Sequence, residues 1–168
     1  MSRRLATATA VLLSFISISS ARAHAQSAGA TPDQQMLEQV ANINEGIALL
    51  AHETMHRAGT FPSKTDAQAV DKQHDAQMDH IHAALGMLSV SYTPKASHAD
   101  STRAAALRKQ SGAAYDSAFR AGVVQLDQQA IQAIDKYSPQ LTNAQIKTMA
   151  QRIRDANAAE AKKLGGTT

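Results

Sequence analysis

The sequence predicts an all-α protein, an antiparallel four-helix bundle formed by a single domain. Four stretches carry apolar residues at intervals of three and four, the spacing that places them on one face of a helix. Aromatic residues make up only 4% of the 168 residues and Trp is absent, whereas Ala and Gln are abundant. This composition is typical of closely packed helices rather than of sheets.

The first 25 residues are expected to be a cleaved secretory signal peptide. Arg3 and Arg4 precede an apolar stretch over residues 5–18, and the segment Ala-His-Ala at residues 23–25 has the small residues that a signal peptidase requires. We therefore expect a mature domain over residues 26–168, periplasmic or secreted; a retained amphipathic anchor is the alternative. The apolar stretch is too short and too interrupted to span a membrane, and no second one follows.

The charge of the chain changes once this signal is removed. The full sequence has 17 Lys and Arg against 14 Asp and Glu, but Arg3, Arg4 and Arg22 lie within the expected signal peptide, which contains no acidic residue. The mature chain is then close to neutral, which gives no electrostatic reason to expect a nucleic-acid partner. Cys is absent, so the sequence offers no disulfide, no thiolate nucleophile and no cysteine for a lipid anchor.

The first helix is expected from Thr31 to about Arg57. Thr31 is a suitable N-cap, Pro32 suits the first turn, and Gln34 is placed to complete a capping box. The helix is expected to end before Gly59. Its apolar face consists of Met36, Val40, Ile43, Ile47 and Leu50.

The second helix is expected to begin with Ser63 and Asp66, which are suited to cap its first turn. A loop over residues 89–99, which contains Pro94, is expected to join the two halves of the bundle. The apolar face of the second helix consists of Val70, His74, Met78, Ile81, Leu85 and Leu88.

The third helix is expected to run without a break from about Asp100 or Ser101 to the Ser-Pro pair at residues 138–139, because Pro disfavours helix at the preceding residue. Thr142 and Gln145 form a second capping box, which starts the fourth helix. The third helix has the apolar face Tyr115, Phe119, Gly122, Leu126, Ala133 and Tyr137, and the fourth has Ile146, Met149, Ala150, Ile153 and Leu164.

Four polar residues lie on or beside these apolar faces. His74 lies in the middle of one face, and Asp127 lies at the margin of another. Asn157 and Glu160 lie within the face of the fourth helix, where an unpartnered carboxylate is costly to bury. One interpretation is a satisfied polar network in the core. The other is a site for a divalent transition metal held by His74, Asp127 and Glu160, since imidazole and carboxylate groups ligate such ions.

The second helix also contains the dense polar segment HDAQMDHIH, residues 74–82. At about 100° per residue its members point in different directions. His80 is expected to face solvent, whereas Asp75, Asp79 and His82 are expected to share the boundary of the core. The segment is therefore not expected to form one site.

Glu53 and His56 match the Glu-x-x-His spacing that di-iron bundles use. They lie away from the apolar face of their helix, so solvated side chains are expected rather than a di-iron centre. His52 and His56 lie one turn apart and form an alternative surface site for Zn²⁺, Cu²⁺ or Ni²⁺. No motif for a nucleophile, a phosphate-binding loop or a zinc hydrolase is present, so the sequence indicates no catalytic residues.

Three segments carry a family resemblance: ALRKQSGAAYDSAF at residues 106–119, SPQLTNAQIKTMAQRIRDANAAEAKKL at residues 138–164, and AVDKQHDAQMDHI at residues 69–81. They resemble a bacterial family of unknown function, often labelled predicted outer-membrane proteins. The resemblance implies an exported bundle with ferritin-like topology, and it places His74 at a histidine of the family's Met-Val-x-Asp-His segment. Relatives commonly carry histidines where this chain has Asp127 and Asn157, which are weaker ligands.

We therefore expect an exported helical bundle with a non-catalytic binding or stress-accessory role and no cofactor. One alternative is a metal-binding ferritin-like protein, for storage or as an oxidoreductase, which uses His74, Asp127 and Glu160. Another is a structural helical module that binds a partner. The partner is a protein or a small ligand that the sequence does not specify, and an oligomer is compatible with it.

Overall fold

Five α-helices and one 3₁₀ turn make up the part of the chain that the computed structural model describes, residues 29–57 and 60–166. These residues contain no strand, which confirms the all-α prediction. The expected signal peptide lies outside the described residues. The elements are α1 (Pro32–His56), α2 (Phe61–Met87), α3 (His98–Leu107), α4 (Gly112–Tyr137), the 3₁₀ turn η1 (Ser138–Gln140) and α5 (Ala144–Lys163).

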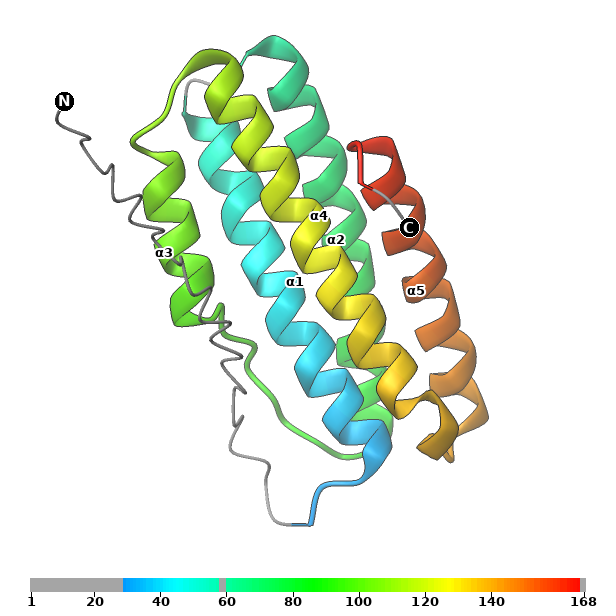
Figure 1. The fold of residues 1–168 in the computed structure, drawn as a ribbon. Coiled ribbons are helices and arrows are strands. Elements are labelled where there is room, and N and C mark those ends of the chain that lie inside the picture. Colours follow the sequence, from blue (N-terminus) through cyan, green and yellow to red (C-terminus); the bar gives the residue numbers. More distant parts are fainter. Residues whose placement is uncertain (1–28, 58–59, 167–168) are drawn as a thin grey trace, which may run out of the picture.

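The four long helices lie side by side, and the short helix α3 covers one flank (Figure 1). α1 and α2 form one antiparallel hairpin, and α4 and α5 form another. The segment between the hairpins, which includes α3, returns along the bundle, so that α2 and α4 run in the same direction. α1 contacts α2, α3 and α4, while α5 packs mainly on α4 and touches α2 over a smaller area.

The starts of α1 and α2 follow the predicted capping only in part. The hydroxyl of Thr31 accepts a hydrogen bond from the backbone N–H of Gln34, as expected, but the side chain of Gln34 donates to Glu38 instead of completing a capping box. α2 begins at Phe61 and not at Ser63, because a Pro is tolerated in the first turn, where no backbone donor is needed. The predicted cap residue Asp66 instead forms an ion pair with Arg120.

The predicted third helix is wrong, because it consists of two helices. Ser97 and Asp100 form a capping box that starts α3 before the predicted position, and α3 ends at Leu107. α4 begins at Gly112, whose backbone has φ +53°, a left-handed conformation that glycine adopts readily. The described chain thus has five α-helices rather than four.

The start of α5 is fixed by α1. Asp33 accepts hydrogen bonds from the backbone N–H and the hydroxyl of Thr142, and from the backbone N–H of Asn143. Thr142 is therefore not the N-cap that was predicted. Asn143 takes this position, and its side chain accepts from the backbone N–H groups of Gln145 and Ile146.

The core consists of two apolar clusters separated along the bundle. The cluster nearer η1 includes Leu37, Val40, Ile81, Leu85, Ile134, Ile146 and Ile153. The cluster nearer α3 includes Ile47, Leu50, Val70, Leu107, Phe119, Val123 and Leu126. Among the described residues, no helix combines the length and apolar content needed to cross a membrane.

Candidate metal centre

Six buried polar side chains lie at the level between the two apolar clusters. On α1 and α2 the change from one cluster to the other falls at these polar positions, and on α4 it falls at Asp127. We call this set the polar layer. It consists of Asn44 from α1, His74 and Gln77 from α2, Asp127 from α4, and Asn157 and Glu160 from α5.

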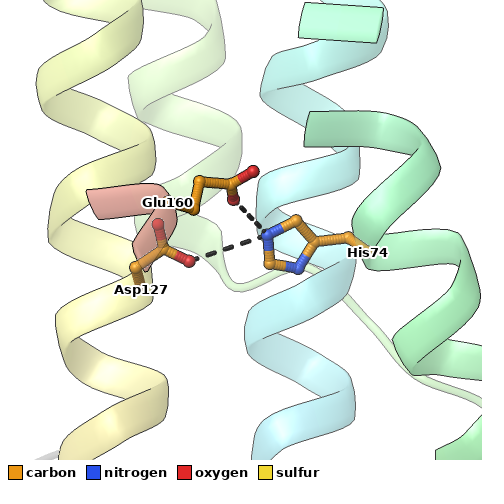
Figure 2. A group of neighbouring side chains, drawn as sticks. All are labelled: His74, Asp127 and Glu160. Carbon is orange, nitrogen blue, oxygen red and sulfur yellow. Dashed lines mark hydrogen bonds and ion pairs between the residues drawn. The ribbon is translucent and has the colours of Figure 1, made fainter. Parts of the chain in front are cut away.

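Three ionisable groups of the polar layer converge from three helices (Figure 2). Nε2 of His74 lies 2.7 Å from Oε2 of Glu160 and 3.6 Å from Oδ1 of Asp127. All three residues are buried, and Asp127 has no exposed surface. The structure therefore brings together His74, Asp127 and Glu160, the three residues that the sequence predicts as metal ligands.

The other ring nitrogen of His74 is held by an amide chain. Nδ1 of His74 lies 3.1 Å from Oδ1 of Asn44, which can only accept, so Nδ1 carries the proton. The Asn44 amide donates to Oε1 of Gln77, and the Gln77 amide donates to Oδ1 of Asn157. Along this series of hydrogen bonds each amide oxygen accepts and each nitrogen in contact donates. The series therefore fixes the orientation of the His74 imidazole.

Nε2 of His74 faces two carboxylates, those of Glu160 and Asp127. An ionised carboxylate has no hydrogen to donate, so a contact of 2.7 Å between Nε2 and Glu160 requires a proton between them. A metal cation at the same place would satisfy both groups instead. A metal-bound His usually donates its second N–H to an oxygen acceptor, which is the role that Asn44 has here.

Asp127 is the least satisfied member of the polar layer. Neither of its carboxylate oxygens has a hydrogen-bond partner, since Nε2 of His74 is beyond hydrogen-bond distance. Burial, and secondarily the charge of Glu160, raise the pKa of Asp127 from 3.8 to about 8. A carboxylate in this situation either stays protonated or requires a cation.

The ligand atoms available in this group lie within 4.8 Å of one another. Metal bonds to imidazole nitrogen and carboxylate oxygen are about 2.0–2.2 Å long, so only a modest adjustment separates these atoms from a common ion. One nitrogen and two oxygens, without sulfur, suit Zn²⁺, Fe²⁺ or Mn²⁺ better than a soft ion such as Cu⁺.

Of the three amide residues in the polar layer, one was predicted from the sequence and two were not. Asn157 was predicted in the core and lies there, with its Nδ2 lacking a hydrogen-bond partner. Asn44 and Gln77 were not predicted, although both occupy apolar-face positions. Asn44 follows Val40 by four residues, and Gln77 follows His74 by three, so the helical period contained the signal.

The remaining polar residues of segment 74–82 do not belong to the centre. His80 is exposed, as predicted. Asp75, Asp79 and His82 are exposed as well, so their predicted place at the core boundary is wrong. α5 approaches α2 on the side of His74 and Gln77, which point to Glu160 and Asn157, whereas these three side chains lie on the exposed side of α2.

The Glu-x-x-His pair lies outside the polar layer. Glu53 forms ion pairs with Arg57 and Arg108 and its side chain is only 8% exposed, so it is not the solvated side chain that was predicted, whereas His56 is exposed. His52 lies 3.0 Å from Asp71, an ion-pair distance. No group of three or more metal-ligating side chains is found in residues 29–57 and 60–166 other than His74, Asp127 and Glu160.

Comparison with known proteins places this bundle in a family. A family described as a domain of unknown function (DUF4142) matches residues 19–163. The chain belongs to this family. The match confirms that the chain is a member of a family of unknown function, and the DUF4142 region covers all six residues of the polar layer. No curated protein and no solved structure matches the chain.

Proposed function

We propose that this protein binds one divalent transition-metal ion in its polar layer, with His74, Asp127 and Glu160 as ligands. The observation that carries the proposal is the buried carboxylate of Asp127, whose two oxygens accept no hydrogen bond beside an imidazole nitrogen that faces carboxylates only. A cation bound there satisfies all of these groups at once. The protein then acts as an exported metal-binding protein with a binding or stress-accessory role rather than as a catalyst.

Two features support the rest of the proposal. The return of the chain between the two hairpins, with α2 and α4 in the same direction, supports a ferritin-like topology. Arg3 and Arg4, the apolar residues 5–18 and the Ala-His-Ala segment support export and cleavage near Ala25. Cell fractionation followed by mass spectrometry tests both claims: absence of the protein from the periplasm contradicts export, and an intact N-terminus there contradicts cleavage near Ala25.

Metal analysis of the untagged protein tests the metal site. We expect about one equivalent of Zn²⁺, Fe²⁺ or Mn²⁺ by elemental analysis, and saturable binding of Co²⁺ by the metal-free protein with a visible spectrum. The variant His74→Gln is expected to lose both signals. His80→Gln is the matched control, since His80 lies on the same helix and is exposed.

The variant Asp127→Asn separates loss of the ligand from loss of the fold. It keeps the volume of the side chain and replaces the carboxylate by a neutral amide, so the metal-free bundle remains folded while metal binding disappears. Circular dichroism and thermal unfolding with and without Zn²⁺ distinguish these two effects. Metal binding that persists in both His74→Gln and Asp127→Asn contradicts the proposal.

A further inference from the structure

An open groove lies between α2 and α5, away from the three metal ligands. Its volume is about 660 Å³, within the range of about 300–1,000 Å³ that is common for small-molecule sites. Most of its wall is apolar, formed by small alanines together with Met87, Ile146, Met149 and Ile153. Gln77 closes the groove toward the polar layer through its hydrogen bond to Asn157.

Small side chains account for the groove. α2 presents Ala76 and Ala83 on this side, and α5 presents Ala144 and Ala156, where larger residues would fill the space between the helices. Met87 is 54% exposed at one end of the groove, although a large apolar side chain is normally covered. The groove therefore offers an apolar surface that this chain leaves uncovered within its described residues.

The ionisable side chains that line the groove are all basic. Its lining contains Arg152 and His80 but no carboxylate. Arg152 forms no ion pair, whereas every other arginine of the described ranges does so, including Arg154 on the same helix, which pairs with Asp135. An exposed guanidinium without a partner beside an apolar wall is complementary to an anion with an apolar body.

The helices bring these two basic side chains to neighbouring levels of the groove. α2 and α5 run in opposite directions, and the bond from Gln77 to Asn157 fixes their register. His80 lies one turn beyond Gln77, and Arg152 lies between one and two turns before Asn157. The apolar wall then continues for about 10 Å from His80 to Met87, at 1.5 Å per residue.

We propose that the groove between α2 and α5 binds a free medium-chain fatty acid, with its carboxylate at Arg152 and its chain along the alanine, isoleucine and methionine wall toward Met87. The guanidinium donates hydrogen bonds to the carboxylate, and His80 lies near the same end. The apolar chain covers the wall that ends at Met87. This site is separate from the metal centre, and the proposal does not depend on the metal.

Calorimetry with decanoate and decanol on the metal-free protein tests the site. We expect saturable binding of one decanoate, and binding of the neutral decanol that is weaker by about tenfold or more, the loss expected for a charge-assisted hydrogen bond. Arg152→Met, which keeps an apolar stem, is expected to weaken decanoate binding by a similar factor and to leave decanol binding unchanged. Arg154→Met is the matched control and is expected to bind decanoate like the unaltered protein.

A variant that fills the groove provides an independent test. Ala83 is exposed, so Ala83→Leu is expected to fold normally and to weaken the binding of both ligands. Equal affinities for decanoate and decanol, or unchanged decanoate binding by Arg152→Met, overturn the proposal. A dimer seen by light scattering that Ala83→Leu abolishes and decanoate does not dissociate also overturns it, because a second copy then occupies the groove.

Discussion

Replacing Asp127 by Asn is expected to stabilise the metal-free protein near neutral pH. The pKa of Asp127 is raised from 3.8 to about 8 in the folded protein, so between these values the folded state keeps a proton that the unfolded chain releases. Because the unfolded state then binds fewer protons, the free energy of unfolding falls as pH rises, by about 1.4 kcal/mol per pH unit. From pH 4 to pH 7 the loss is about 4 kcal/mol, and it ceases above about pH 8. Asn is neutral throughout and avoids this loss.

Urea unfolding followed by circular dichroism, in EDTA at several pH values between 5 and 8, measures this difference. The curves for the two proteins are expected to approach each other at the acidic end and to diverge toward pH 8. Asp135→Asn is the control, since the side chain of Asp135 is 50% exposed on the same helix and an exposed ion pair contributes only about 0–1 kcal/mol. Parallel curves, or an Asp127→Asn variant that is less stable at pH 7, would refute the reasoning.

Four other substitutions test the packing and hydrogen bonding of the bundle. Gly46→Ala places a Cβ 3.0 Å from Cγ and Oδ2 of Asp100 and is expected to lower the free energy of unfolding by about 1–3 kcal/mol. Gly86→Ala meets no atom within 4 Å and is expected to raise the free energy of unfolding by roughly 0.5–1 kcal/mol. Thermal unfolding of the two variants measures this difference. Asp33→Ala is expected to remove about 1–3 kcal/mol at pH 7. Burial opposes the charge of Asp33, but hydrogen bonds from Thr142 and Asn143 outweigh burial and lower its pKa, so this contribution is present above about pH 4 and lost as acid titrates the folded state; an equal difference at pH 2 and pH 7 would contradict it. Thr54→Val removes a buried hydrogen bond to the hydroxyl of Tyr115 and is expected to cost about 1–3 kcal/mol in urea unfolding, while an unchanged midpoint would show that this bond contributes nothing.

The sequence alone was sufficient to place His74 and Glu160 in the core. Each lies on the apolar face of a helix, and the helical period determines which residues share a face. It could not determine that these residues meet, because convergence depends on how α2, α4 and α5 are aligned along the bundle. Asp127 shows this limit clearly: from the period it lies at a margin, yet in the structure it is completely buried.

The differences between the predicted and observed elements have specific structural causes. The break between α3 and α4 falls in residues 108–111, flanked on both sides by alanines that favour helix, so propensity alone predicts continuity. The cap of α5 moves from Thr142 to Asn143 because Asp33, more than a hundred residues earlier, binds Thr142. The groove between α2 and α5 and the lack of an ion pair at Arg152 do not follow from periodicity, since both depend on how the helices pack.

The polar layer also restricts how the helices slide past one another. A shift of α2 or α5 by one turn, about 5.4 Å, would carry His74 or Glu160 away from its partner and into a wholly apolar environment. Burying these polar groups without their hydrogen-bond partners costs several kcal/mol, whereas wholly apolar faces tolerate such shifts with less loss. The groups that we propose to hold the ion therefore also select one register of the helices along the bundle axis, even when no ion is bound.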